Sequence, residues 1–225
     1  MAYGIQLHVW GERACFTRPE MKVERVSYDV MTPSAARGIL EAILWKPQIR
    51  WAVDRIHVLK PIRFQSFRRN EVGAKISVVN AERALRAGTT AGLGLSVDEN
   101  RQQRATTLLV NVAYVIEAHF ALTDKATTDD TPAKYASMFN RRAGAGQCFH
   151  RPCLGTREFP ADFELIREGF ALPASELPAA DHEKDLGWML HDIDFANGNT
   201  SRFFRARLTG GVLDVERCLA EGTAA

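Results

Sequence analysis

The chain has 225 residues, of which 46% are hydrophobic and 25% are charged, and its formal net charge is +2. This composition excludes general disorder, because a disordered chain combines low apolar content with a high net charge. The longest apolar stretches are far shorter than the ~20 residues that a membrane-spanning helix needs, and the first residues lack the pattern of a signal peptide. The sequence therefore predicts a cytoplasmic globular protein with no membrane partner.

The N-terminal part of the chain is expected to fold as a strand, a helix and a second strand. Apolar and polar residues alternate over residues 3–10, which is typical of a strand. A threonine followed by a proline opens the segment 32–47, where apolar residues recur at helical spacing until a second proline ends the run. Alternation returns over residues 49–61 and predicts the second strand.

The middle of the chain combines an irregular basic segment with another strand and helix. Residues 63–107 show no sustained period, and a connection of this length inside a compact domain is uncommon unless it is functional or disordered. Residues 108–122 alternate as a strand does, and a second threonine–proline pair opens a helix over residues 131–146. Residues 154–159 are expected to supply one more short strand.

This order of elements, strand-helix-strand twice with a hairpin connection between, is that of a ferredoxin-like (RRM-like) domain. After residue 160 the pattern changes to short strands, at 163–166, 186–195 and 203–215. We therefore expect an α+β protein with two parts. Residues 1–160 are predicted to form the ferredoxin-like domain, with the basic excursion at 63–107, and residues 161–225 a small antiparallel β region.

The small net charge hides a strong asymmetry along the chain. Residues 1–159 carry 23 Lys or Arg and 15 Asp or Glu, a net charge of +8, whereas residues 160–225 carry 6 and 12, a net charge of −6. Residues 55–104 alone hold ten basic and four acidic side chains. This distribution is typical of a protein that binds a polyanion such as nucleic acid, although basic side chains also simply solvate surface loops.

Four segments, in a fixed order along the chain, carry a resemblance to a known family: residues 28–43, the Trp-Lys-Pro at 45–47, the Arg-Asn-Glu at 69–71 and the Leu-Gly-Thr-Arg-Glu-Phe at 154–159. Together they resemble the CRISPR-associated family-five protein of subtype I-C, which belongs to the repeat-associated superfamily built on ferredoxin-like domains. The resemblance extends from about residue 3 to residue 207, so it covers nearly the whole chain.

The resemblance implies an endoribonuclease that cleaves CRISPR precursor RNA at the repeat hairpin, with no metal and no cofactor. It also implies that the protein stays on the 5′ handle of the mature guide RNA. There it would be a subunit of the interference complex, with the backbone and large subunits as partners. Double-stranded DNA is a further candidate partner at the level of the family.

Cleavage without a metal uses the 2′-hydroxyl of the RNA as nucleophile, so the protein must move two protons and stabilise charge on phosphorus. The family pattern uses a tyrosine near the end of the first helix and a Lys-His pair early in the second. These positions are occupied here by Leu44, Lys134 and Tyr135. Lys134 is expected to stabilise the phosphorane, and Tyr135 is a candidate acid or base. Tyr28 and His150 are further titratable candidates. The alternative for Tyr28 is a packing role, and the alternative for His150 is contact with a phosphate or with solvent.

Several basic and aromatic side chains are candidates for contact with RNA, because Arg binds phosphate through two hydrogen bonds and aromatic rings stack on unpaired bases. The basic candidates are Arg18, Lys22, Arg25, Lys46, Arg68, Arg69, Arg142 and Arg151. The aromatic candidates are Phe16, Phe64, Phe67 and Trp45, with core packing as the alternative. No metal site is expected, because the segment 148–153 lacks the paired ligand spacing of a structural zinc site.

The departures from the family pattern leave a second interpretation open. With a leucine and a tyrosine at two of the three catalytic positions, the protein is alternatively a handle-binding scaffold subunit that does not cleave. A general RNA- or DNA-binding protein is a third interpretation, which predicts a steep salt dependence and no hairpin preference.

Overall fold

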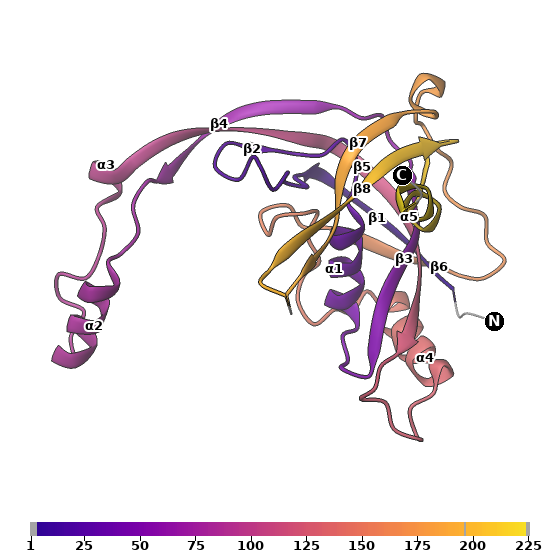
Figure 1. Ribbon diagram of the computed structural model, residues 1–225, viewed down its shortest axis with the longest axis horizontal. Coiled ribbons are helices and arrows are strands. Elements are labelled where there is room, and N and C mark those ends of the chain that lie inside the picture. The colour runs from indigo at the N-terminus through magenta and orange to yellow at the C-terminus, as the bar shows by residue number, and fades with distance from the viewer. Residues whose placement is uncertain (1–3, 196, 224–225) are drawn as a thin grey trace. The chain divides into compact units, whose positions relative to one another are not determined.

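The computed structural model describes residues 4–195 and 197–223, which fall into two compact units. Of these residues, 4–65, 107–195 and 197–223 belong to the first unit, and 66–106 belong to the second. The order of the elements is shown in Figure 1. Among the described residues, no helix is both long enough and apolar enough to span a bilayer.

The first unit is built on an antiparallel sheet. Its strands are β1 (Ile5–Ala14), β2 (Arg25–Val26), β3 (Ile49–Val58), β5 (Arg101–Leu122), β6 (Asp162–Ile166), β7 (Asp185–Asp194), β8 (Thr200–Thr209) and β9 (Val212–Asp214). They are ordered β6-β1-β5-β3-β9-β8-β7, with β2 paired to β5 outside this path. Each of the pairs β1–β5, β1–β6 and β3–β5 is antiparallel. The sheet is therefore a large antiparallel one, as an α+β protein requires.

Two helices with the same N-terminal chemistry pack on this sheet. Helix α1 (Pro33–Ile43) starts after Thr32, whose hydroxyl accepts a hydrogen bond from the amide of Ala35, and α4 (Pro132–Gly144) starts in the same way after Thr131. Helix α1 packs on β3 and β7, and α4 packs on β6. Both helices and the predicted strands at 49–61 and 108–122 are thus confirmed. The strand predicted at 3–10 is confirmed as β1, except that residue 3 lies outside the described residues.

The C-terminal strands also follow the predicted pattern. The segments 163–166 and 186–195 become β6 and β7, and the segment 203–215 divides at the Gly210-Gly211 turn into β8 and β9. Two elements were not predicted: a short 3-10 turn before β7, η1 (Ala179–Asp181), and a helix after β9, α5 (Val215–Thr223). The division of the chain near residue 160 stays a prediction, and strands from both sides of that position share one sheet.

The strand predicted at residues 154–159 is wrong. These residues form a tight loop, in which the amide of Leu154 binds the carbonyl of Phe159 at 2.8 Å, and only an isolated bridge joins Cys153 to Pro160. The loop lies against the end of β1, because the amide of Cys15 binds the carbonyl of Leu154 at 3.0 Å. Gly155 makes this close approach possible, since its φ is +89° and a Cβ atom there would overlap the carbonyl oxygen of Cys15.

The second unit corrects the expectation of an irregular excursion at 63–107. It contains most of β4 (Phe64–Val72), all of α2 (Val78–Ala87) and α3 (Val97–Asn100), and the start of β5, which pairs with β4. No described side chain of α2 is buried. The unit holds ion pairs of its own, in which Arg69 and Arg104 approach Glu71 at 3.2 and 3.1 Å. Helix α2, strand β4 and the first residues of β5 were missed because almost none of their side chains enter a core.

We predict that Gly155→Ala destabilises the protein by about 3 kcal/mol or more, from overpacking and a left-handed backbone together. Gly146→Ala is the matched control, since Gly146 has φ +66° but open space around its Cα. It should cost about 1 kcal/mol, from the backbone alone. Urea unfolding measures both values, and equal losses would contradict the close approach of residue 155 to β1.

Candidate nucleic-acid site

The start of α4 holds Lys134 and Tyr135 on a shared carboxylate. The ammonium of Lys134 lies 2.9 Å from Oδ1 of Asp130, and the hydroxyl of Tyr135 donates to the same oxygen at 2.6 Å. The other oxygen of Asp130 accepts from the amide and the hydroxyl of Thr127, each at 3.0 Å. Asp130 thus organises both candidate catalytic residues, and sequence reasoning missed this role. The available signal was its spacing of four and five residues before them.

These contacts lower the pKa of Asp130 and raise the pKa of Tyr135. Hydrogen bonds from the Thr127 amide, the Tyr135 hydroxyl and the Lys134 ammonium hold the pKa of Asp130 well below its usual range. The hydrogen bond to Asp130, with burial, raises the pKa of Tyr135 to about 12. Tyr135 is only 3% exposed, whereas the Lys134 side chain is 48% exposed. Of the two, Lys134 is the one that a phosphate can reach.

A cluster of aromatic rings connects this site to the end of α1. Tyr135 meets Phe120 edge-on at 6.4 Å between ring centroids, and Phe120 meets Trp51 at 5.2 Å. The indole nitrogen of Trp51 donates to the carbonyl oxygen of Leu44 at 2.9 Å. Lys134, Tyr135 and Leu44, which the resemblance places at the three catalytic positions, therefore belong to one packed region of the first unit. Leu44 itself is fully buried.

The C-terminal end of α1 receives two further hydrogen bonds from distant segments. The amide of Phe149 binds the carbonyl of Ala42 at 2.8 Å, and the guanidinium of Arg142 binds the carbonyl of Ile43 at 2.9 Å. These bonds bring the loop after α4 to this end of α1. His150 follows Phe149 and is exposed, and the two rings meet edge-on at 6.0 Å.

Tyr28 lies apart from this region, before the N-terminal end of α1. Its ring is buried, and its hydroxyl accepts a hydrogen bond from the amide of Leu190 at 3.2 Å. Burial raises its pKa, and the negative charge of Glu20 acts in the same direction. The guanidinium of Arg18 lies 4.5 Å from the ring centroid. These contacts fit the packing alternative for Tyr28.

The remaining basic candidates differ in how far their charge is already engaged. Arg18 approaches Asp29 at 3.6 Å, Arg25 approaches Glu158 at 3.0 Å, and Arg151 is paired with Asp162. In the first unit, Lys22 is exposed and Lys46 is half-buried. Arg68 is exposed and Arg69 is paired with Glu71, both in the second unit.

The stacking candidates divide in a similar way. Phe16 is buried and packs edge-on against Tyr114 at 6.0 Å, which fits the core alternative. Phe64 is exposed, and Phe67 is half-buried with the Arg69 guanidinium 5.8 Å from its centroid. Trp45 is 61% exposed.

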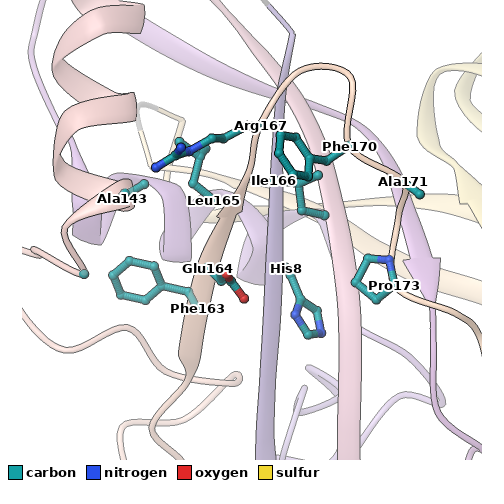
Figure 2. Close-up of a pocket in the computed structure, with 12 residues that line it drawn as sticks. His8, Ala143, Phe163, Glu164, Leu165, Ile166, Arg167, Phe170, Ala171 and Pro173 are labelled. Atoms are coloured by element: carbon teal, nitrogen blue, oxygen red, sulfur yellow. The ribbon is translucent and has the colours of Figure 1, made fainter.

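A cavity of about 450 Å³ lies beside β1 and β6, and Figure 2 shows the side chains that line it. His8 and Glu164 are register partners there, and burial lowers the pKa of His8 although Glu164 opposes the shift. No predicted site residue is among the described residues that line it. A larger hollow, of about 1110 Å³, includes Asp54, Glu117 and Glu168, whose charges disfavour a polyanion. Among the described residues, no group of three or more His, Cys, Asp or Glu is arranged to hold a metal ion.

We predict that Asp130→Asn lowers the melting temperature at neutral pH. Because the folded pKa of Asp130 is depressed, its stabilisation is complete above the unfolded pKa of about 3.9 and is lost as the pH falls below that value. The gap between wild type and variant should therefore narrow below about pH 4. Circular dichroism melts measure it, with the exposed neighbour Asp129→Asn as control. A gap that is independent of pH would contradict the assignment.

Comparison with known proteins identifies the family. Residues 4–216 match the family Cas_Cas5d, described as CRISPR-associated protein (Cas_Cas5). The chain is 59% identical over 221 residues, 98% of both chains, to a protein of Mannheimia succiniciproducens named CRISPR pre-crRNA endoribonuclease Cas5d. A protein of the same name from Thermus thermophilus is 45% identical over 191 residues, 85% of this chain and 73% of that protein.

The fold comparison agrees with the sequence comparison. The crystal structure of a CRISPR-associated protein superposes with a TM-score of 0.66 at 24% identity, covering 94% of this chain and 90% of that one, so the two share a fold. The resemblance carried by the four sequence segments is confirmed: the chain is a member of the Cas5d family of CRISPR-associated proteins, the family-five proteins of subtype I-C.

Proposed function

We propose that this chain is a metal-independent endoribonuclease that cleaves CRISPR precursor RNA at the repeat hairpin. The observation that carries the proposal is the 59% identity, over 98% of both chains, to a relative named as a pre-crRNA endoribonuclease. After cleavage, the protein keeps the 5′ handle of the guide RNA and acts as a subunit of the interference complex, beside the backbone and large subunits. Double-stranded DNA is a second nucleic acid for the same basic surfaces.

We assign β1, α1, β3, β5, α4 and β6 to a ferredoxin-like (RRM-like) unit. The strand order β6-β1-β5-β3, with all three neighbouring pairs antiparallel, supports this assignment. The helices α1 and α4 each connect two strands that are not neighbours, as that element order requires. In this assignment the reaction takes place where the end of α1 approaches α4.

The reaction is an in-line displacement at phosphorus. The 2′-oxygen loses its proton and bonds to phosphorus, the bond to the 5′-oxygen breaks, and that oxygen takes a proton. The products are a 2′,3′-cyclic phosphate and a 5′-hydroxyl. Lys134 neutralises the charge that develops on the phosphoryl oxygens. Its exposed ammonium in the first turn of α4 supports this role.

The proton transfers fall to groups other than Leu44, which is apolar. Tyr135 stays protonated at neutral pH, since its pKa is raised to about 12, so it can act only as a proton donor. We assign the base role to His150, whose exposed imidazole follows the residue that binds the end of α1. Tyr28 receives no catalytic role, because it lies before the N-terminal end of α1, where its hydroxyl accepts a hydrogen bond from the amide of Leu190.

The test is incubation with repeat RNA in EDTA, beside a copy that carries a 2′-deoxy nucleotide at the cut site. We expect cleavage of the first RNA only. Lys134→Ala should lower kcat by roughly 10²- to 10³-fold, the usual effect of removing one group that stabilises the transition-state charge. Lys125→Ala is the matched control, since Lys125 is exposed in the loop before α4 and should cleave as wild type does.

The second candidate function is a handle-binding scaffold subunit that does not cleave. It is favoured by the buried Leu44 at one family position and by the hydroxyl of Tyr135, which is bound to Asp130. Tight binding of both RNAs without cleavage of either would establish this function and overturn the first. Cleavage of the 2′-deoxy RNA would contradict 2′-hydroxyl attack.

A further inference from the structure

Two large aromatic side chains are uncovered on segments that meet at the end of α1. Trp45, one residue after Leu44, is 61% exposed, and Phe149 is 87% exposed. Both rings therefore keep most of their apolar surface in water, where a ligand that covers it gains hydrophobic stabilisation. Neither residue has a role in the proposed proton transfers.

The backbone beneath these rings is held firmly. The Phe149 amide binds the Ala42 carbonyl at 2.8 Å, and the Trp51 indole, which is buried, binds the Leu44 carbonyl at 2.9 Å. The rings thus project from fixed points on two segments that are more than a hundred residues apart in the sequence. An aromatic side chain on such a support loses little conformational entropy when a flat ligand stacks on it.

The charge around the rings favours a nucleic acid over a protein as the ligand. The segment 42–53 contains Lys46 and Arg50 and no acidic residue. The segment 131–157 contains five basic residues and no acidic residue, and two of the five, Lys134 and Arg151, are paired with carboxylates outside it. Exposed aromatic rings within a cationic surface are the combination that binds unpaired bases, whose faces stack while the phosphates meet positive charge. Bases inside an A-form duplex are already stacked, so unpaired or terminal bases are the ones that fit.

We propose that Trp45 and Phe149 form a stacking platform for unpaired bases that flank the scissile phosphate of the RNA. The proposal rests on the proposed function, because it gives the same site a determinant of substrate position. The rings connecting Tyr135, Phe120 and Trp51 place the platform in the same packed region as Lys134. A base held there would fix the register of the strand at the reacting phosphate.

The test measures binding rather than cleavage, so that it stands apart from the test of activity. Repeat RNA with 2′-deoxy at the cut site is titrated into the full chain, wild type, Trp45→Ala or Phe149→Ala. Each variant should bind on the order of tenfold or more weakly, and Trp45→Phe should restore most of the affinity. Trp188→Ala is the matched control, since Trp188 is also 61% exposed, and it should bind as wild type does.

Abasic substitution of the RNA, one nucleotide at a time, identifies the stacked base. At one flanking position the abasic RNA should cost wild type the same factor, and Trp45→Ala should add no further loss there. Additive losses at every position, or unchanged affinity of both alanine variants at an unchanged melting temperature, would overturn the proposal. Loss of binding to a partner subunit with RNA affinity intact would also overturn it, in favour of a protein-docking surface.

Discussion

The last carbonyl groups of α1 need hydrogen-bond partners that no following turn of the helix supplies. Three other parts of the chain provide them: the amide of Phe149, the guanidinium of Arg142 and the indole of Trp51. This single requirement ties β3, α4 and the loop after α4 to one end of one helix. Because those partners are directional, the elements meet in a defined arrangement, and the side chains next to the junction inherit fixed positions. The candidate reaction site and the uncovered rings both depend on it.

At the start of α4, the carboxylate of Asp130 gives Lys134 and Tyr135 different roles. Asp130 binds the hydroxyl of Tyr135 and the ammonium of Lys134 through the same oxygen. The buried phenol therefore keeps its proton, while the ammonium of Lys134 stays at the surface. A histidine would present an imidazole near neutral pKa at that position, whereas Tyr135 presents a phenol that Asp130 has bound. In the proposed mechanism, charge stabilisation therefore falls to Lys134 and the base role to a residue of another segment.

Much of the fold could be predicted from local chemistry, because alternation marks strands with one buried face and a threonine–proline pair marks the start of a helix. The prediction failed where the local sequence does not indicate the structure that forms. Residues 154–159 look extended in sequence, but Gly155 turns them against the carbonyl of Cys15, a contact between distant segments. Helix α2 buries no described side chain, so no pattern of core residues in the sequence predicts it. Lys134 and Tyr135 could be named from the resemblance. Asp130 could have been found from its spacing of four and five residues before them, whereas Phe149 binds Ala42, a distant residue that spacing does not reveal.

In the proposed function, RNA reacts where the end of α1 meets α4 and its following loop. Photocrosslinking tests it most directly, with a photoreactive base placed beside the cut site of uncleavable repeat RNA and the crosslinked peptides identified by mass spectrometry. We expect crosslinks within residues 42–51 and 130–151, and their loss when the photoreactive base is moved far from the cut site. Crosslinks confined to β7 and β8, with none in those two segments, would contradict it.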